Sequence, residues 1–321
     1  MKYPIEIEKI YKDIIDLKIQ GATNVAISTL EGMKVAVKNE VVKDDHLLER
    51  ITDIGNYLAY ARPNEPLAQN SVLYIKHFFL EKNGMQLELD GEKELLDDLC
   101  DEYLQIIADA KSKIIELNFP KLTYIDHILT HCHSSTAEKM IKAIAKGDRD
   151  FTAVCTETRP RYQGRITAKN LIDAHISTTL ITDSAAESFI IGRGSKSVSA
   201  VFIGADIITM KGYCVNKIGS WGIAMAAKQA DKPVYVVTPL LKIDHNSPRQ
   251  EIEIEVREDK ELWVDAPDGL DMYNPAFEIV DAGLITGFIT EYGILKHNEI
   301  GDLVRKEYPW LFEQELDGKL N

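Results

Sequence analysis

The residues best suited to chemistry directly follow predicted β-strands. The apolar run YIDHILT leads into His131-Cys132-His133, and the run AVFIG leads into Ala205-Asp206. Between these, FTAVC leads into residues 156–160 (TETRP), and TTLIT leads into Asp183. Ligands bind beyond the carboxyl ends of the strands in an open parallel sheet, so we expect these side chains to form one site.

Cys132 lies between two histidines and just before a predicted helix that begins near Ser134 to Thr136. A helix N-terminus and a nearby imidazolium both stabilise a thiolate, so Cys132 could act as an acid, a base or a nucleophile. The alternative is a small packed residue at a strand end, which spacing alone favours. We do not expect His131 and His133 to share a metal with Cys132, because strand alternation turns them to the opposite side.

Asp206 is a carboxylate at the end of an almost wholly apolar strand. Partial burial there could raise its pKa into a range that suits general acid–base catalysis. The alternative is an aspartate that caps the following turn, a common role for this residue type.

Basic residues suited to an anion gather in two places. The first group consists of Arg159, Arg161, Arg165 and Lys169, with Glu157 as the nearest acidic residue. Gly164 lies within this group and allows close approach of the backbone. Lys217 precedes Gly219-Ser220, where the N-terminus of a predicted helix suits a phosphate. A solvated basic surface is equally compatible with this composition. Neither GxGxxG nor GxxxxGK[ST] occurs, so we expect no dinucleotide or P-loop site.

Hydrophobic periodicity predicts the elements that position these residues. After residue 120, short apolar runs alternate with helical stretches, which predicts a parallel sheet with helices on both faces. Before it, residues 5–17 and 92–117 show helical spacing, and the second helix is expected to end at Asn118-Phe119-Pro120. We therefore expect an α/β protein with a helical N-terminal domain over residues 1–119 and a Rossmann-like catalytic domain over residues 120–321.

The composition excludes several classes of protein. The 321 residues include 37 Lys plus Arg and 51 Asp plus Glu, a net charge of −14 that disfavours nucleic-acid binding. The sequence contains no run of about 18 apolar residues, so we expect no membrane span. The charged N-terminus does not resemble a secretion signal. The four cysteines fit no zinc pattern, so we expect a reducing, cytoplasmic location.

Six segments together resemble one family. They are THCHS (130–134), TETRPRYQGRITAK (156–169), DSAA (183–186), GAD (204–206), NKIGS (216–220) and NPAF (274–277). These segments resemble the archaeal ribose-1,5-bisphosphate isomerases, in the superfamily that also holds methylthioribose-1-phosphate isomerases and regulatory subunits of initiation factor two-B. The resemblance covers most of residues 120–300, and in the N-terminal third it rests on architecture and two short loops.

The resemblance implies isomerisation of ribose 1,5-bisphosphate to ribulose 1,5-bisphosphate in nucleoside-monophosphate salvage, with no metal or redox cofactor. It places the catalytic cysteine at Cys132 and the catalytic aspartate at Asp206. We expect Cys132 to move the carbon-bound proton and Asp206 the oxygen-bound proton. The implied substrate contacts are Gly21, Ala22, Arg62, Arg159, Gln163, Asn216 and Lys217. The resemblance also implies a homodimer or a larger homo-oligomer and leaves room for a nucleotide activator.

The chain departs from the family pattern at three points, and one of them is Ala61-Arg62-Pro63-Asn64, where the family has ARPT or TRPT. Gln20 stands where the family has a substrate-binding arginine, and Met210-Lys211-Gly212 follows the GAD segment, where Lys211 could supply a positive charge. These departures leave two alternatives open. The first is a methylthioribose-1-phosphate isomerase with an apolar slot for the thioether, and the second is a non-catalytic regulatory protein.

Overall fold

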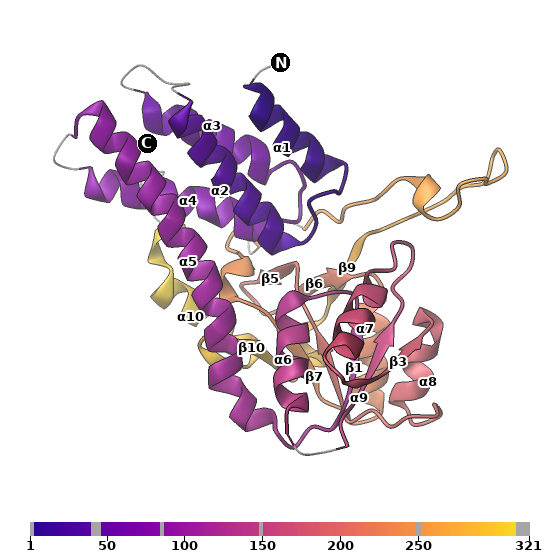
Figure 1. Ribbon diagram of the computed structural model, residues 1–321. Helices are drawn as coiled ribbons and strands as arrows, with labels where there is room; N and C mark the ends of the chain where they lie inside the picture. The colour runs from indigo at the N-terminus through magenta and orange to yellow at the C-terminus, as the bar shows by residue number, and fades with distance from the viewer. Residues whose placement is uncertain (1–2, 40–45, 84–86, 148–149, 248–251, 313–321) are drawn as a thin grey trace. The chain divides into compact units, whose positions relative to one another are not determined.

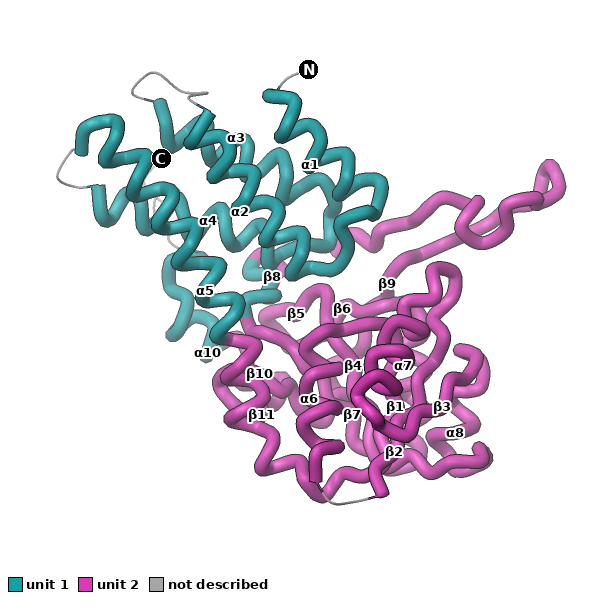
Figure 2. The backbone as a smooth tube through the Cα atoms, viewed as in Figure 1, with its two compact units in different colours: residues 1–109, 241–245, 302–321 teal, residues 110–240, 246–301 magenta. Residues whose placement is uncertain are grey.

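The computed structural model describes residues 3–39, 46–83, 87–147, 150–247 and 252–312. The chain divides into two compact units, of which unit 1 comprises residues 1–109, 241–245 and 302–321 and unit 2 comprises residues 110–240 and 246–301 (Figure 2). Across the described residues, no helix combines the length and apolar character needed to cross a membrane.

Unit 1 is helical, as the periodicity of its sequence predicts. Its helices are α1 (Ile5–Ile15), α2 (Ala22–Lys38), α3 (Leu47–Ala59), α4 (Pro66–Lys82) and the first part of α5 (Leu89–Leu122) (Figure 1). Two later segments join them, and these contain β8 (Ile243–Asp244), most of α10 (Ile300–Glu307) and the 3₁₀ helix η6 (Pro309–Leu311).

The observed units differ from the expected boundary after residue 119. The buried Asn70 amide of α4 donates hydrogen bonds to the carbonyls of Leu241 and Ile243, both at 2.9 Å, and so holds residues 241–245 in unit 1. Tyr74 of the same helix packs edge-on against Trp310 with ring centroids 5.5 Å apart, which holds the C-terminal segment there. Contacts of this kind join segments distant in the chain, so hydrophobic periodicity does not reveal them.

Helix α5 also differs from its prediction, because it continues to Leu122 with Pro120 inside it. A proline lacks the N–H that an interior helical residue donates. The buried Asn118 amide donates to the carbonyl of Ile114 and to that of Thr290, both at 2.8 Å, and therefore ties this part of the helix to unit 2. The helix therefore ends at Leu122 and not at residues 118–120, where the sequence predicted its end.

Unit 2 is built on a seven-stranded sheet in the order β11-β10-β7-β4-β1-β2-β3, all parallel except the β10–β11 pair. Its strands are β1 (His127–His131), β2 (Thr152–Thr156), β3 (Ser177–Ile181), β4 (Ala200–Ile203), β7 (Val234–Val237), β10 (Gly287–Thr290) and β11 (Gly293–Leu295). Five of these strands coincide with the apolar runs of the sequence, namely β1, β2, β3, β4 and β7. The α/β architecture is therefore confirmed.

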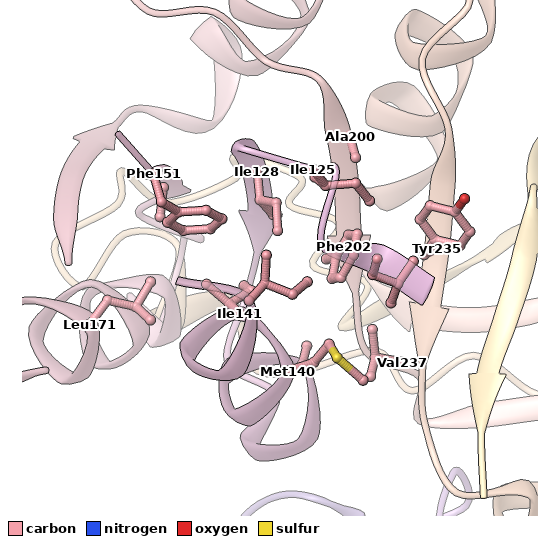
Figure 3. Packing of buried hydrophobic residues seen from close by; sticks show 14 of the residues in the cluster. Ile125, Ile128, Met140, Ile141, Phe151, Leu171, Ala200, Phe202, Tyr235 and Val237 are labelled. Atoms are coloured by element: carbon pink, nitrogen blue, oxygen red, sulfur yellow. The ribbon is translucent and has the colours of Figure 1, made fainter. Parts of the chain in front are cut away.

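Helices cover both faces of this sheet. The end of α5 lies with α6 (Ser135–Ala145) and α7 (Gln163–Asp173) on one face, and their apolar side chains pack on Ile128 and Phe202 (Figure 3). The helices α8 (Ala186–Ile190) and α9 (Ser220–Gln229) pack on one another, and α9 packs on β4 and β7 (Figure 1). Because side chains alternate along a strand, His131 faces away from the side to which Ile128 points.

Three short strands of unit 2 pair antiparallel in a second sheet that the sequence did not reveal. They are β5 (Ile207–Thr209), β6 (Cys214–Lys217) and β9 (Phe277–Val280). Single-turn helices η1 (Asp183–Ala185), η2 (Leu240–Lys242), η3 (Asp259–Glu261), η4 (Ala282–Leu284) and η5 (His297–Glu299) complete the described elements. Residues 252–276, which include η3, form an extended arm of unit 2 (Figure 2).

Gly164 brings the start of α7 against the end of β2 more closely than any other residue could. A Cβ atom at this position would lie 1.8 Å from the carbonyl oxygen of Thr156. We predict that Gly164→Ala lowers the free energy of unfolding by about 3 kcal/mol, since backbone must move to relieve the overlap. Gly283→Ala is the matched control, because a Cβ there meets nothing within 4 Å. Urea denaturation of both variants would measure the difference, and equal stability would contradict this reading.

Candidate active site

Cys132 occupies a strand-to-helix turn, as the sequence predicts. It follows β1 with a left-handed backbone (φ 68°), and Ser134 caps α6 by accepting a hydrogen bond from the Ala137 N–H at 3.3 Å. The Cys132 N–H donates to Thr158 Oγ1 at 2.9 Å, and the Cys132 carbonyl accepts from Thr167 Oγ1 at 3.0 Å. Positive φ is costly for a residue other than glycine, and two hydroxyl groups hold this one in place.

The loop after β2 is held by a carboxylate from the end of β3. Asp183 accepts hydrogen bonds from the backbone N–H groups of Thr158 and Arg159, both at 2.7 Å. Thr158 also has a left-handed backbone, with φ 63°. Asp183, which the sequence placed at a strand end, therefore shapes the loop that supports Cys132.

Asp206 and Lys217 join Cys132 at the carboxyl end of the sheet. Asp206 is half-buried after β4, and its N–H donates to the Val215 carbonyl of β6 at 2.9 Å. Lys217 ends β6 and is 4% exposed, with its ammonium 4.7 Å from the ring centre of Phe277. Both charges act on the Cys132 thiol, so the two residues expected to be catalytic and the expected lysine lie in one electrostatic environment.

The Cys132 thiol is harder to ionise than the sequence suggested. Burial raises its pKa to about 11, and the Asp206 carboxylate contributes to the rise. Lys217 is the strongest influence in the other direction, followed by the backbone of His133 and by Arg257. The expected thiolate is therefore not favoured in the free protein, because desolvation is the largest influence on the thiol.

Lys217 experiences the reciprocal effects. Burial lowers the pKa of its ammonium, and Arg257 lowers it further, whereas Cys132, Asp206 and Glu255 raise it. In the described part of the chain this ammonium forms no ion pair, so its charge is available to a thiolate or to a bound anion.

Arg257 is a member of the site that the sequence did not reveal. Its side chain is 8% exposed, and its Nε donates to Glu255 at 3.2 Å. Its guanidinium lies 5.9 Å from the ring centre of Phe277, which Lys217 also contacts. Arg257 follows a bridge between Val256 and Pro275 in the arm, and no periodic pattern marks that segment.

The first group of basic residues is not an open anion site. Arg161 pairs with Glu261 and Arg165 pairs with Glu157, both at 2.7 Å. Arg159, expected to bind substrate, is exposed and donates to Tyr162 Oη at 2.7 Å and to the Leu262 carbonyl at 3.0 Å. Residues of the arm therefore partner two of these arginines, which local sequence could not show.

The expected phosphate site at the start of α9 is also occupied. One carboxylate oxygen of Glu278 accepts from the N–H groups of Gly219 at 2.6 Å and Trp221 at 2.8 Å. Asn216 is 4% exposed, and its amide donates to Ser220 Oγ at 2.8 Å. A carboxylate of the chain thus takes the place in which we expected a phosphate.

Gln163 begins α7 after Tyr162, whose backbone is left-handed. Among the described residues, its buried side-chain oxygen Oε1 has no hydrogen-bond partner. A buried acceptor of this kind carries a desolvation penalty until a donor reaches it. The position therefore fits the substrate contact expected for Gln163.

The three contacts expected from the N-terminal part lie in unit 1. Gly21 precedes α2 with φ 82°, and Ala22 is buried at the start of that helix. Arg62 is 6% exposed and pairs with the buried Glu65 at 2.8 Å. Their contact with a substrate remains a prediction.

Comparison with known proteins shows the family to which this chain belongs. Residues 18–297 match the Initiation factor 2 subunit family, and the chain belongs to it. A Methanocaldococcus jannaschii relative named ribose 1,5-bisphosphate isomerase is 33% identical over 309 residues, which are 95% of this chain and 96% of the relative. A Pyrococcus furiosus relative with the same name is 28% identical over 318 residues, 96% of each chain.

Two solved structures share this fold. A Pyrococcus horikoshii protein described as translation initiation factor eIF-2B has a TM-score of 0.76 at 23% identity, covering 92% of this chain and 98% of its own. The 5-methylthioribose 1-phosphate isomerase of the same organism has a TM-score of 0.75 at 23% identity, covering 94% of this chain and 87% of its own. These likenesses support the fold described above.

Removing the Lys217 charge should make Cys132 a weaker acid. We predict that Lys217→Met slows alkylation of Cys132 by iodoacetamide about tenfold at pH 9, because a rise of one pKa unit reduces the thiolate fraction tenfold. Mass spectrometry can follow this reaction, since Cys100, Cys155 and Cys214 are buried and Cys132 is half-buried. Lys211→Met, in the exposed turn between β5 and β6, is the matched control. An unchanged rate in Lys217→Met would contradict the assigned influence.

Proposed function

We propose that this chain is an aldose–ketose isomerase that converts ribose 1,5-bisphosphate into ribulose 1,5-bisphosphate. The observation that carries the proposal is the convergence of Cys132, Asp206 and Lys217 at the carboxyl end of the sheet. A thiol and a carboxyl group supply one acid–base group for carbon and one for oxygen. The names of the archaeal relatives support the choice of substrate.

The proton transfers follow from the structure of the substrate. Because O1 carries a phosphate, ring opening must place a proton on the ring oxygen, and Asp206 gives that proton as the bond to C1 breaks. The Cys132 thiolate removes the proton from C2, and the electrons of that bond form the C1–C2 double bond of an enol phosphate. Asp206 then takes the proton of the C2 hydroxyl, while Cys132 returns its proton to C1 and the ketone forms.

At the start of this cycle Asp206 must carry a proton and Cys132 must be a thiolate. The high pKa of Cys132 favours the opposite arrangement in the free enzyme, and the positive charge of Lys217 is the strongest influence that favours the thiolate. We therefore assign Lys217 two tasks, which are stabilising the thiolate and attracting a phosphate of the substrate.

The remaining contacts are proposed from the chemistry of the side chains. Gln163 Oε1 would accept a hydrogen bond from a sugar hydroxyl, and Asn216 would contact a sugar or phosphate oxygen. Arg159 would bind phosphate by exchanging its present partners, and the resemblance adds Gly21, Ala22 and Arg62 as further proposed substrate contacts. A nucleotide activator, a place in nucleoside-monophosphate salvage and a cytoplasmic location belong to the same proposal.

The catalytic pair is tested by two conservative variants. We predict that Cys132→Ser and Asp206→Asn each lower kcat on ribose 1,5-bisphosphate by at least about 10²-fold, the usual loss for a general acid or base. Cys100→Ala, which changes a buried thiol in unit 1, should retain activity. Product formation is measured with methylthioribose 1-phosphate offered in parallel, and thermal melting checks the fold. Full activity of either variant would contradict the assignment.

The assay also separates the alternatives. Turnover of methylthioribose 1-phosphate alone would replace the proposed substrate. Binding of either sugar phosphate without turnover would instead support a regulatory protein.

We further propose that the chain forms at least a dimer. The arm exposes large apolar side chains, with Trp263 54% and Val264 74% exposed and Tyr273 71% exposed. Apolar surface of this kind on an extended segment favours a contact with another copy of the chain.

Light scattering tests this proposal directly. The purified protein should have the mass of a dimer or a larger oligomer, and Val264→Asp should shift the population toward monomer by placing a charge in the contact. A monomer at micromolar concentration would contradict the proposal. If Val264→Asp remains a dimer, the arm does not form the dimer contact.

A further inference from the structure

The ring of His131 links the two parts of the proposed active site. His131 ends β1 and is 2% exposed, and its ring lies between Thr156 of β2 and the carbonyl of Ile218 after β6. Strands β1 and β6 belong to different sheets, since β1 is in the parallel sheet and β6 is in the antiparallel one. A change in the ring therefore affects both.

The hydrogen bonds around this ring have a fixed direction. The Ile218 carbonyl can only accept, so His131 Nε2 carries a proton and donates to it at 2.8 Å. In the neutral ring Nδ1 is then an acceptor, and the Thr156 hydroxyl donates to it at 2.6 Å. This arrangement assigns one tautomer to His131.

The same direction continues to Cys132. Thr158 Oγ1 accepts from the Cys132 N–H at 2.9 Å, and its own hydroxyl donates to Thr156 Oγ1 at 3.3 Å. Each hydroxyl thus receives one hydrogen bond and gives one. A continuous series of donors runs from the Cys132 backbone through two threonines and the histidine to Ile218, the neighbour of Lys217.

We propose that His131 is a positioning residue, whose neutral Nε2–H tautomer holds the turn after Lys217 and the backbone of Cys132 in register for proton transfer. This inference rests on the proposed function. Gly219 supports it, because a Cβ there would lie 3.1 Å from Cε1 and Nε2 of His131 in a backbone with φ 104°. The turn is therefore shaped to receive the ring closely.

Protonation of His131 would reverse this arrangement, since Nδ1 would become a donor and the Thr156 hydroxyl would have to turn from donating to accepting. Burial lowers the pKa of the ring, with Lys217 acting in the same direction, whereas the Ile218 carbonyl, Asp183 and Glu187 raise it. The neutral ring consequently persists below the ordinary histidine pKa and is lost only as the pH falls through the lowered value.

Thr156→Val tests the proposal, because it removes the hydroxyl and nearly keeps the shape. We expect kcat to fall about tenfold or more with little change in KM, since a small displacement of reacting groups is costly. The neutral ring also loses the hydrogen bond that it accepts, so the His131 pKa should rise. The acid limb of the kcat profile should then move to higher pH.

The chain offers a matched control at the other end of the same two strands. His127 Nδ1 lies 2.9 Å from Thr152 Oγ1, in the same register of β1 and β2. Thr152→Val should leave kcat and the acid limb unchanged. Equal losses of kcat in both variants would show that Thr156 contributes only to the stability of the fold, and this would overturn the proposal.

Two measurements need no turnover and so separate this proposal from the proposed function. Nitrogen-15 NMR of the histidine rings, assigned with His131→Gln, should show a protonated Nε2 and an unprotonated Nδ1 in the wild type and a changed Nδ1 signal in Thr156→Val. Alkylation of Cys132 should slow in Thr156→Val, because Lys217 no longer lies in register. The opposite tautomer in the wild type would overturn the proposal even if the enzyme is active, and an inactive wild type with the expected tautomer would overturn only the function.

Discussion

The buried charge of Lys217 is the constraint on which the rest of the site depends. Removing an ammonium from water costs several kcal/mol unless other groups compensate. Here the face of the Phe277 ring and the Asp206 carboxylate provide part of that compensation. These groups and the neighbouring Cys132 come from the ends of β1, β4, β6 and β9, so the parallel sheet and the antiparallel strands must meet at one edge. The carboxylate of Glu278 fixes that junction by capping α9.

Local patterns were sufficient for the parallel sheet and for placing the two proposed catalytic residues at the ends of its strands. Cys132 and Asp206 follow continuous apolar runs, and such runs specify buried parallel strands whose carboxyl ends lie along one edge. The ionisation of Cys132 was predicted in the wrong direction, because the sequence shows the nearby helix and histidines but does not show how far the fold buries the thiol. Burial depends on the packing of the whole unit, and here it outweighs every local charge.

The partners of the cations could not be read from the sequence for a related reason. Glu261 approaches Arg161 from the arm, and Glu278 reaches the start of α9 from β9, although both glutamates lie far along the chain from the groups that they contact. Arg257 enters the site from the same irregular arm. A run of arginines therefore predicts positive charge at a place, whereas the fold decides which of those charges have internal partners.

This pairing bears on how a chain with a net charge of −14 would receive the multiply charged bisphosphate of the proposed function. Carboxylates already neutralise Arg161 and Arg165, and Arg257 is tied to Glu255, so these cations attract an incoming anion only weakly. Lys217 differs, because burial lowers its pKa and no ion pair within the described residues offsets that effect. A phosphate placed beside it would raise that pKa and keep the ammonium charged. In the proposed function, substrate and lysine would thus stabilise each other's charge, and this mutual effect would favour an anion small enough to enter the site.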